Sequence, residues 1–246
     1  MKRIVGTKVY HFEELDSTND YATQLLSKNK PIEGSVVITD HQVQGKGQYG
    51  RKWNTVKGQN ITLSVILYPN LDALRQFDLN VMASMAVTMV INSLTGLTAM
   101  VKWPNDIYLN DKKVCGILIK NNLYGSSIHQ SVIGIGLNVN QSAFDAALPN
   151  ASSLAIESNS TLVLSQVRET LYTKIDYCYD LLKDDAKTLR KLYQSALWRK
   201  DEQSRLLVNK KEEIGIIKDI NEHGKLLVEI RKEVRAYDMS QIKIIV

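Results

Sequence analysis

The stretch that decides the fold is DHQVQGKGQYGRKW, residues 40–53. It follows the apolar run SVVIT, residues 35–39, which is typical of a buried strand. Three glycines within residues 45–50 leave the backbone free to fold closely around a ligand. Lysine and arginine recur between residues 41 and 70, whereas aspartate and glutamate do not occur there. A flexible, cationic, acid-free loop after a strand suits an anionic small molecule, because backbone N–H groups and cations replace the water that the anion loses.

The spacing Gly-x-Gly-x-x-Gly in this loop also occurs in dinucleotide-binding proteins, where it opens an amphipathic helix. Here the next residues, RKWNTVKGQN (51–60), have no helical apolar period. The following apolar run, ITLSVILY (61–68), alternates like a strand and ends at Pro69. The sequence therefore predicts a strand, a long glycine loop and a second strand, which argues against a Rossmann unit. The loop motif by itself leaves one alternative open, namely a flexible hairpin loop that binds no ligand.

A helix is expected on each side of this unit. Ser17, Thr18 and Asn19 precede an apolar-periodic segment and mark a helix start. These side chains either cap the helix or hydrogen-bond a polar ligand at its N-terminus, and the pattern favours neither reading. Residues 74–94 predict one long helix with a broad apolar stripe, in which the methionines belong to the core.

Residues 99–119 predict three short strands, the first of which ends before Pro104. Four polar side chains stand inside this apolar frame: Lys102, Asn105, Asp106 and Lys113. Lys113 is either a satisfied charge at the end of a strand or a cation aimed into a pocket, and the pattern gives the two readings equal weight.

Residues 131–140 predict a further strand in which Gly134, Gly136 and Asn138 share one face. Glycine on one face of a strand indicates close approach by a ligand or by another backbone. Residues 162–200 predict two helices, and the short strands beyond them indicate a small barrel. We therefore expect one domain over residues 1–200 and a second over 201–246.

The bulk composition sets limits on the class of protein. A net charge of +5 over 246 residues is compatible with phosphate-bearing ligands or acidic partner proteins, but is too weak to require nucleic acid. Two cysteines and four scattered histidines predict neither a disulfide framework nor a bound metal. The chain starts without the apolar core of a signal peptide, and no apolar run approaches membrane-spanning length. We therefore expect a cytoplasmic protein that does not act at a membrane.

Five motifs in order resemble those of the bacterial biotin–protein ligases, and the resemblance covers essentially the whole chain. They are STN (17–19), GKGQYGRKW (45–53), KWPND (102–106), KVCGIL (113–118) and GIGLNVN (134–140). KWPND is the most specific of them. The resemblance implies an α+β fold: a mixed, largely antiparallel sheet flanked by helices, as in class II synthetases, followed by a small SH3-like β-barrel.

The resemblance also implies a two-step reaction. The carboxylate of biotin attacks the α-phosphate of ATP, with Mg²⁺ arriving on the nucleotide, and biotinyl-5′-AMP forms. A lysine of a biotin carboxyl carrier protein, from acetyl-CoA carboxylase or a related carboxylase, then takes the biotin. The same resemblance assigns Lys113, Arg51 and Asp106 as catalytic. It assigns the following residues to binding of biotin and nucleotide: Ser17, Thr18, Asn19, Gln42, Gly45, Lys46, Gly47, Gln48, Trp53, Lys102, Asn105, Gly116, Gly134, Gly136 and Asn138.

The resemblance further implies separate roles within that set. Ser17, Thr18 and Gln42 would hydrogen-bond the ureido ring of biotin. Lys113 would contact the carboxylate and then the acyl phosphate. Trp53 would stack on adenine, and Asn138 would hydrogen-bond it.

Two features, the glycine loop and residue 120, depart from the family's pattern. The glycine loop reads Gly-Lys-Gly-Gln where Gly-Arg-Gly-Arg is usual, so Gln48 removes a charge and predicts weaker retention of the adenylate. Lys120 stands where an acidic residue is common.

The few residues before the first strand leave no room for a winged helix, so we expect no operator binding. A monomer and a homodimer are both compatible with the sequence. The rival readings are a lipoate or octanoate ligase or transferase of the same superfamily and a nucleic-acid-binding module.

Overall fold

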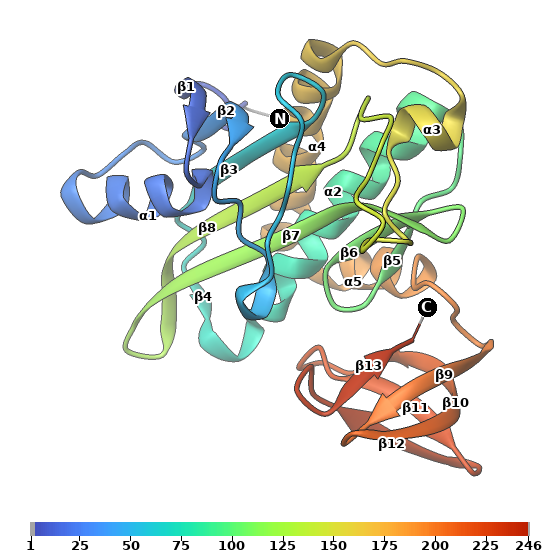
Figure 1. Cartoon of the computed structure of the whole chain (residues 1–246). Helices are drawn as coiled ribbons and strands as arrows, with labels where there is room; N and C mark the ends of the chain where they lie inside the picture. The colour runs from blue at the N-terminus through green and yellow to red at the C-terminus, as the bar shows by residue number, and fades with distance from the viewer. Residues whose placement is uncertain (1–2, 246) are drawn as a thin grey trace.

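The computed structural model describes residues 3–245 and contains two β-sheets (Figure 1). The larger sheet has eight strands in the order β1-β2-β3-β8-β7-β6-β5, with β4 paired to β8. Only β1 and β2 run parallel among its described pairs, so the sheet is mixed and largely antiparallel, as expected. Its strands are β1 (Val9–Leu15), β2 (Val36–Gln42), β3 (Ile61–Leu67), β4 (Leu71–Asp72), β5 (Met100–Lys102), β6 (Asp106–Leu109), β7 (Lys112–Tyr124) and β8 (Ser127–Leu137).

The second sheet is antiparallel and has five strands in the order β12-β11-β10-β9-β13. Its strands are β9 (Gln203–Val208), β10 (Lys211–Ile220), β11 (Leu226–Ile230), β12 (Glu233–Tyr237) and β13 (Ile242–Ile244). The α-helices are α1 (Thr18–Lys28), α2 (Phe77–Thr95), α3 (Leu154–Ser158), α4 (Leu164–Asp184) and α5 (Ala186–Ser195), and two short 3₁₀ turns are η1 (Gln48–Gly50) and η2 (Ala73–Arg75).

Helices cover both faces of the large sheet, because its strands carry apolar side chains on both faces. In β3, Val65 packs in the main core with α2, while Ile66 packs with Ala22 and Leu26 of α1 on the opposite face. Figure 1 shows α2, α4 and α5 on one side of the sheet and α1 toward its other side. The face that carries α1 is the one available for a ligand, since α2 and α4 close the other.

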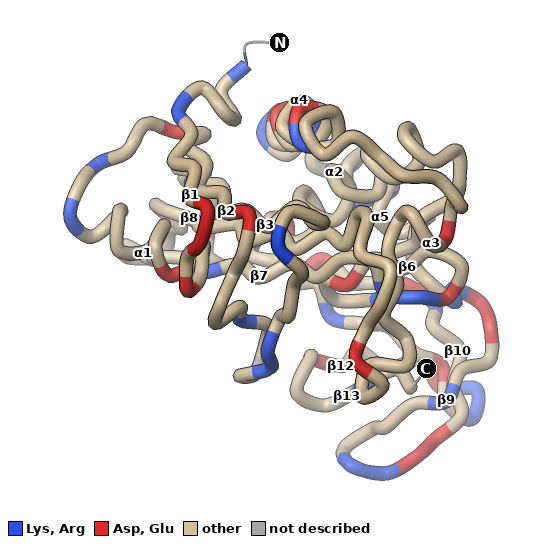
Figure 2. The backbone as a smooth tube through the Cα atoms, turned by 45° about the horizontal axis from the view of Figure 1, so that its top comes forward, with Lys and Arg blue, Asp and Glu red and all other residues tan. Residues whose placement is uncertain are grey.

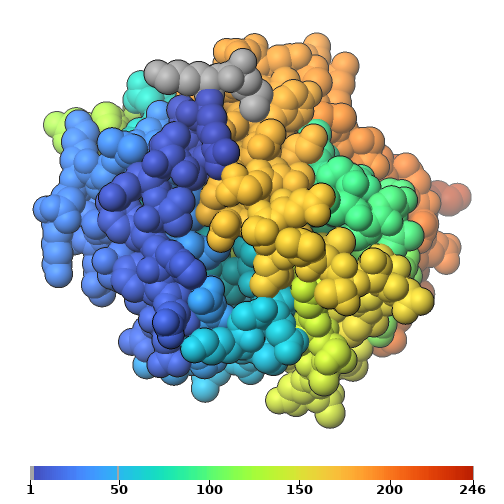
Figure 3. All heavy atoms as spheres, turned by 90° about the horizontal axis from the view of Figure 1, so that it is seen from above, coloured from blue at the N-terminus to red at the C-terminus, as the bar shows by residue number. Residues whose placement is uncertain are grey.

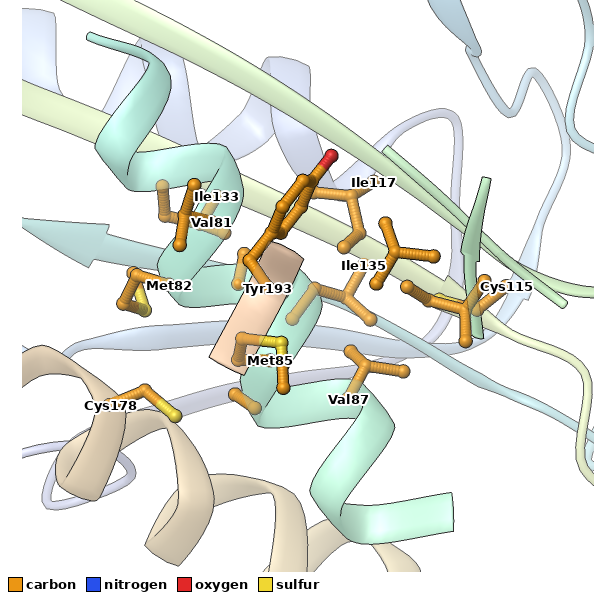
Figure 4. Packing of buried hydrophobic residues seen from close by; sticks show 14 of the residues in the cluster. Val81, Met82, Met85, Val87, Cys115, Ile117, Ile133, Ile135, Cys178 and Tyr193 are labelled. Atoms are coloured by element: carbon orange, nitrogen blue, oxygen red, sulfur yellow. The ribbon is translucent and has the colours of Figure 1, made fainter. Parts of the chain in front are cut away.

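Helix α2 forms the centre of the core. Figure 4 shows its Val81, Met82 and Met85 against Ile133 and Ile135 of β8, so its methionines are packing residues as expected. By length and composition alone, residues 73–95 would suffice to cross a membrane, so the expectation that no apolar run approaches that length is wrong by this measure. Most of that segment, 72%, is buried inside the protein.

The N-terminal segment is fastened to α4. The backbone N–H groups of Ile4 and Val5 donate to the buried carboxylate of Asp176, at 3.0 Å for Val5. Figure 3 shows this early segment, in dark blue, lying beside the gold atoms of α4.

Two strands are longer than the sequence indicates. We expected strands at 113–119 and 131–140, whereas β7 continues to Tyr124 and β8 begins at Ser127 and ends at Leu137. The added part of the hairpin pairs polar side chains across the strands, with Asn122 donating to Gln130 at 3.0 Å. Polar cross-strand pairs carry no apolar alternation, so the pattern that identifies strands is missing there.

The second sheet is docked on the first unit through the turn between β10 and β11. The indole N–H of Trp103 donates to the carbonyl of Gly224 at 2.9 Å, and the ring of Phe77 lies where a Cβ of residue 224 would be. Residues of both sheets belong to one continuous apolar cluster, which includes Val101, Ile217 and Ile242.

We expect Gly224→Ala to destabilise the protein by about 2 kcal/mol more than Gly125→Ala, because its methyl group would overlap Phe77. Both glycines have positive φ, +78° and +59°, so both variants share the backbone strain, but residue 125 faces open space. Chemical unfolding of the two variants measures the difference, and equal midpoints would contradict this docking contact.

Candidate active site

A cavity of about 860 Å³ lies on the α1 face of the large sheet. Its floor includes a patch of small residues on neighbouring strands, in which Thr62 of β3 pairs with Gly136 of β8, and Gly134 of β8 pairs with the buried Ser64 of β3. Gly116 of β7 completes the patch, because it pairs with Gly136 from the other side. The sheet therefore allows another group to approach its backbone closely at these glycines.

One end of the cavity is polar and neutral. The backbone N–H of Thr18 donates to the side-chain oxygen of Gln42 at 2.9 Å, and Ser64 donates to the Thr18 hydroxyl at 2.9 Å. Ser17 caps α1 by accepting from the N–H of Asp20 at 3.3 Å, and it also lines the cavity. Ser17 therefore caps the helix and also forms part of the cavity wall.

Asn19 presents an acceptor to the same end of the cavity. Its amide nitrogen donates to the carbonyl of Leu118 at 3.1 Å, while its buried Oδ1 has no partner among the described residues. A buried acceptor without a partner costs free energy unless a ligand N–H satisfies it. This end of the cavity thus fits a small neutral group that both donates and accepts hydrogen bonds.

The middle of the cavity holds an ion pair. Lys113 Nζ lies 2.6 Å from Asp106 Oδ1, and the two side chains are 30% and 25% exposed. The pairing of β6 with β7 produces this contact. Asp106 stands opposite Gly116, and this glycine has no side chain to fill the space beside the carboxylate. Lys113 is therefore a cation that faces the cavity, and Asp106 fixes its position.

The other end of the cavity is cationic. The pKa of Lys102 is lowered to about 8: burial is the largest cause, the cations Lys113, Lys243 and Arg199 also lower the pKa, and Asp106 opposes them. The Lys102 ammonium donates to the Tyr108 hydroxyl at 3.3 Å. A lysine surrounded by other cations gains most from an anionic ligand, which would restore its charged form.

The glycine loop forms one wall. Gly47 N–H donates to the carbonyl of Arg51 at 2.7 Å, and Trp53 N–H donates to the carbonyl of Gly45 at 2.9 Å, so the loop is a small hairpin around η1. This is the strand, loop, strand arrangement that the sequence predicts. In Figure 2 the loop between β2 and β3 shows blue segments for its lysines and arginine, and its sequence contains no acid beyond Asp40.

Trp53 lies on the glycine floor. A Cβ at Gly136 would come within 2.5 Å of the Trp53 indole nitrogen, and one at Gly116 within 3.1 Å of its ring. Gly134 is approached instead by the amide of Asn19, which would lie 2.7 Å from such an atom. Close approach to these glycines was expected from a ligand or another backbone, and in the structure it comes from two side chains.

All the residues that the sequence places in the site line this cavity except Gly45, which packs against the Trp53 carbonyl and Gln42 beside it. Asn138 donates to the carbonyl of Ser152 at 2.9 Å, and its Oδ1 is buried without a described partner. Asn105 donates to the carbonyl of Ile117 and so shapes the wall. Their individual roles stay predictions.

Sequence reasoning missed two parts of the wall. Residues 144, 145 and 147–151, which follow β8, form one of them. Met239, Ile242, Lys243, Ile244 and Ile245 of the second sheet line the same cavity. No motif marks them, because a lysine in a short alternating strand is indistinguishable from a surface residue until the two sheets are docked.

The comparisons with known proteins agree with this arrangement. Residues 11–138 match the Biotin/lipoate A/B protein ligase family. The chain belongs to this family. It is 34% identical over 142 residues to the bifunctional ligase/repressor BirA of Bacillus subtilis, a match that covers 58% of the chain and 43% of that relative. It is 33% identical over 158 residues to the biotin–[acetyl-CoA-carboxylase] ligase of Paracoccus denitrificans, covering 63% of the chain and 61% of that relative.

The fold of this family member is also that of solved biotin protein ligases. The Aquifex aeolicus biotin protein ligase in complex with biotin and ATP superposes with a TM-score of 0.81 at 21% identity, covering 97% of the chain and 99% of that structure. The expected fold class, a large mixed sheet with flanking helices and a separate C-terminal β-sheet, is confirmed.

We expect Gly136→Ala to displace Trp53 from the floor, because the new methyl group would overlap its indole. Acrylamide quenching of tryptophan fluorescence reports this displacement, since Trp103 and Trp198 are buried. Gly47→Ala is the matched control, because residue 47 has an ordinary φ of −107° and its nearest neighbour lies 3.5 Å from the added atom. Equal quenching in the two variants would show that Trp53 does not rest on residue 136.

Proposed function

We propose that this chain is an ATP-dependent biotin–protein ligase, which activates biotin to biotinyl-5′-AMP and transfers it to a lysine of a biotin carboxyl carrier protein. The observation that carries the proposal is the division of one cavity into a neutral hydrogen-bonding end and a cationic end, with Lys113 between them. Membership in the Biotin/lipoate A/B protein ligase family supports it. So does the similarity to the biotin–[acetyl-CoA-carboxylase] ligase of Paracoccus denitrificans.

Each end of the cavity suits one part of the substrates. The ureido ring of biotin carries one acceptor and two N–H donors, which match the hydroxyl, amide and carbonyl groups around Thr18, Asn19 and Gln42. The phosphates of ATP require cations, which Lys102, Lys113 and Arg51 supply. The biotin carboxylate and the α-phosphate then meet near Lys113.

In the first step, a biotin carboxylate oxygen attacks the α-phosphorus and pyrophosphate leaves. Two anions must be brought together, so positioning and cations accomplish most of the catalysis and no protein nucleophile is needed. Lys113 is held at 2.6 Å by Asp106, so its charge is in place before the transition state forms.

In the second step, the neutral amine of the carrier lysine attacks the carbonyl carbon of the mixed anhydride, and AMP leaves with the bridging oxygen. The developing negative charge on that oxygen again lies beside Lys113. Among residues 3–245, no three His, Cys, Asp or Glu side chains form a metal-binding group, so we propose that Mg²⁺ arrives on ATP, held by phosphates and water.

Biotin is favoured over lipoate by the same polar end. A dithiolane ring has no N–H donor and no carbonyl acceptor, so it would leave Asn19 Oδ1 and the Gln42 amide unsatisfied. Sites built to hydrogen-bond a substrate reject analogues that lack those groups, because buried polar groups are left unpaired.

We expect pyrophosphate–ATP exchange that depends on biotin, and we expect Lys113→Ala to lower its rate at least about a hundredfold, the usual effect of removing one preorganised charge donor. Lys57→Ala is the control, since Lys57 is 59% exposed in the same β2–β3 connection, pairs with Glu13 at 3.7 Å and is not among the described residues that line the cavity. Exchange that requires lipoate in place of biotin would overturn the assignment. Exchange that is unchanged in Lys113→Ala would overturn the role of this lysine.

We expect kcat/KM for ATP to fall as the pH rises through about 8, because Lys102 loses the charge that binds phosphate. Lys102→Arg should remove this fall, since arginine stays charged. The fall does not reflect unfolding: the pKa of Lys102 is lower in the folded state than the ordinary 10.5, so its deprotonation between about 8 and 10.5 favours the folded state. Coincident pH profiles for the two enzymes would contradict the prediction.

A further inference from the structure

Three charged side chains meet at the edge of the cavity, where α1, the glycine loop and β7 come together. Asp20 Oδ2 lies 2.5 Å from Lys46 Nζ, and Asp20 Oδ1 lies 2.8 Å from Lys120 Nζ. One carboxylate therefore binds two ammonium groups, one on each oxygen. The cluster carries one positive charge more than its carboxylate neutralises.

The two lysines are bound to Asp20 in different ways. Lys120 extends from the continuous strand β7, where it pairs with Val132 of β8. Lys46 stands between Gly45 and Gly47 in the loop, and it is the member of the cluster that lines the cavity. The side chains of Lys46 and Lys120 are 54% and 41% exposed, but only Lys46 belongs to the cavity wall, so it is the one placed to turn toward a ligand.

Asp20 favours its charged form in this cluster. Burial raises the pKa of this carboxyl, but hydrogen bonds from Lys120 and Lys46 outweigh burial and lower it. Asp20 therefore stays ionised, and it competes for Lys46 with any anion that enters the cavity.

We propose that Asp20 and Lys120 are positioning residues for Lys46. Asp20 holds Lys46 at the mouth of the cavity, and Lys120 remains as the counter-ion of Asp20 when Lys46 turns to the carboxylate and phosphate of the substrates. The inference rests on the proposed function and names the residues that control its anion-binding loop.

The charge arrangement explains why two lysines are needed. If Lys46 were the sole partner of Asp20, its transfer to the substrate would leave a carboxylate that is only 30% exposed without a cation. Lys120 removes that cost, because one ion pair remains. It also accounts for the departure at position 120, since an acidic residue there would repel Asp20 at close range.

The test compares Lys120→Met with wild type in biotin-dependent exchange and in release of bound biotinyl-AMP. We expect KM for biotin to rise and release to quicken by about threefold, the scale of a partly exposed ion pair, with kcat unchanged. Lys120→Arg should restore both values. Asp20→Asn combined with Lys120→Met should also restore them, because no carboxylate then competes for Lys46. Lys57→Met is the control for removing an exposed lysine, since Lys57 pairs with Glu13 at 3.7 Å.

The possible results distinguish the positioning role of Asp20 and Lys120 from the proposed function of the protein. Unchanged KM and release in Lys120→Met, or a double variant as impaired as the single one, would overturn the positioning role while exchange in wild type keeps the proposed function. Absence of biotin-dependent exchange in wild type would instead overturn the proposed function. Unfolding midpoints of all variants identify a purely structural effect, which would lower stability in the double variant without restoring KM.

Discussion

The site depends on a sheet face that carries no large side chain where β3, β8 and β7 lie side by side. Residues 116, 134 and 136 are glycines, and Ser64 and Thr62 pair with Gly134 and Gly136, so few side-chain atoms rise above the backbone here. Larger side chains there would collide with Trp53 and Asn19, which lie on these glycines, whereas the opposite face of the same strands carries isoleucine and leucine against α2. Because side chains alternate along a strand, one register both closes the core and opens the site.

The chemistry follows from what surrounds that floor. Neutral hydrogen-bonding groups stand at the start of α1, an ion pair stands at the centre, and Lys102 of β5 stands at the other end. The second sheet completes the cationic end with Lys243, so its docking through Trp103 and Gly224 belongs to the architecture of the site. A divided cavity of this kind can hold a neutral ring and a polyanion at once, which adenylation of a carboxylic acid requires.

The sequence motifs predict which residues form the site, but they predict the contacts of these residues poorly. STN, the glycine loop and KWPND each bring a distinctive local pattern, and their residues meet in one cavity as expected. The sequence did not predict the tip of the β7–β8 hairpin, because its strands pair asparagine and glutamine across the ladder. The contact of Trp53 with Gly136 and the contribution of β13 also escaped, because both join segments far apart in the chain. Lys120 had no explanation until the fold placed Asp20 beside it.

The path of one oxygen atom tests the central claim most directly. Biotin labelled with ¹⁸O in both carboxylate oxygens is incubated with ATP, the protein and a biotin carboxyl carrier protein, and the nucleotide product is examined by mass spectrometry. If a carboxylate oxygen attacks the α-phosphorus and the carrier amine then attacks the carbonyl carbon, each AMP carries one ¹⁸O atom. Unlabelled AMP, or ADP in its place, would contradict the account.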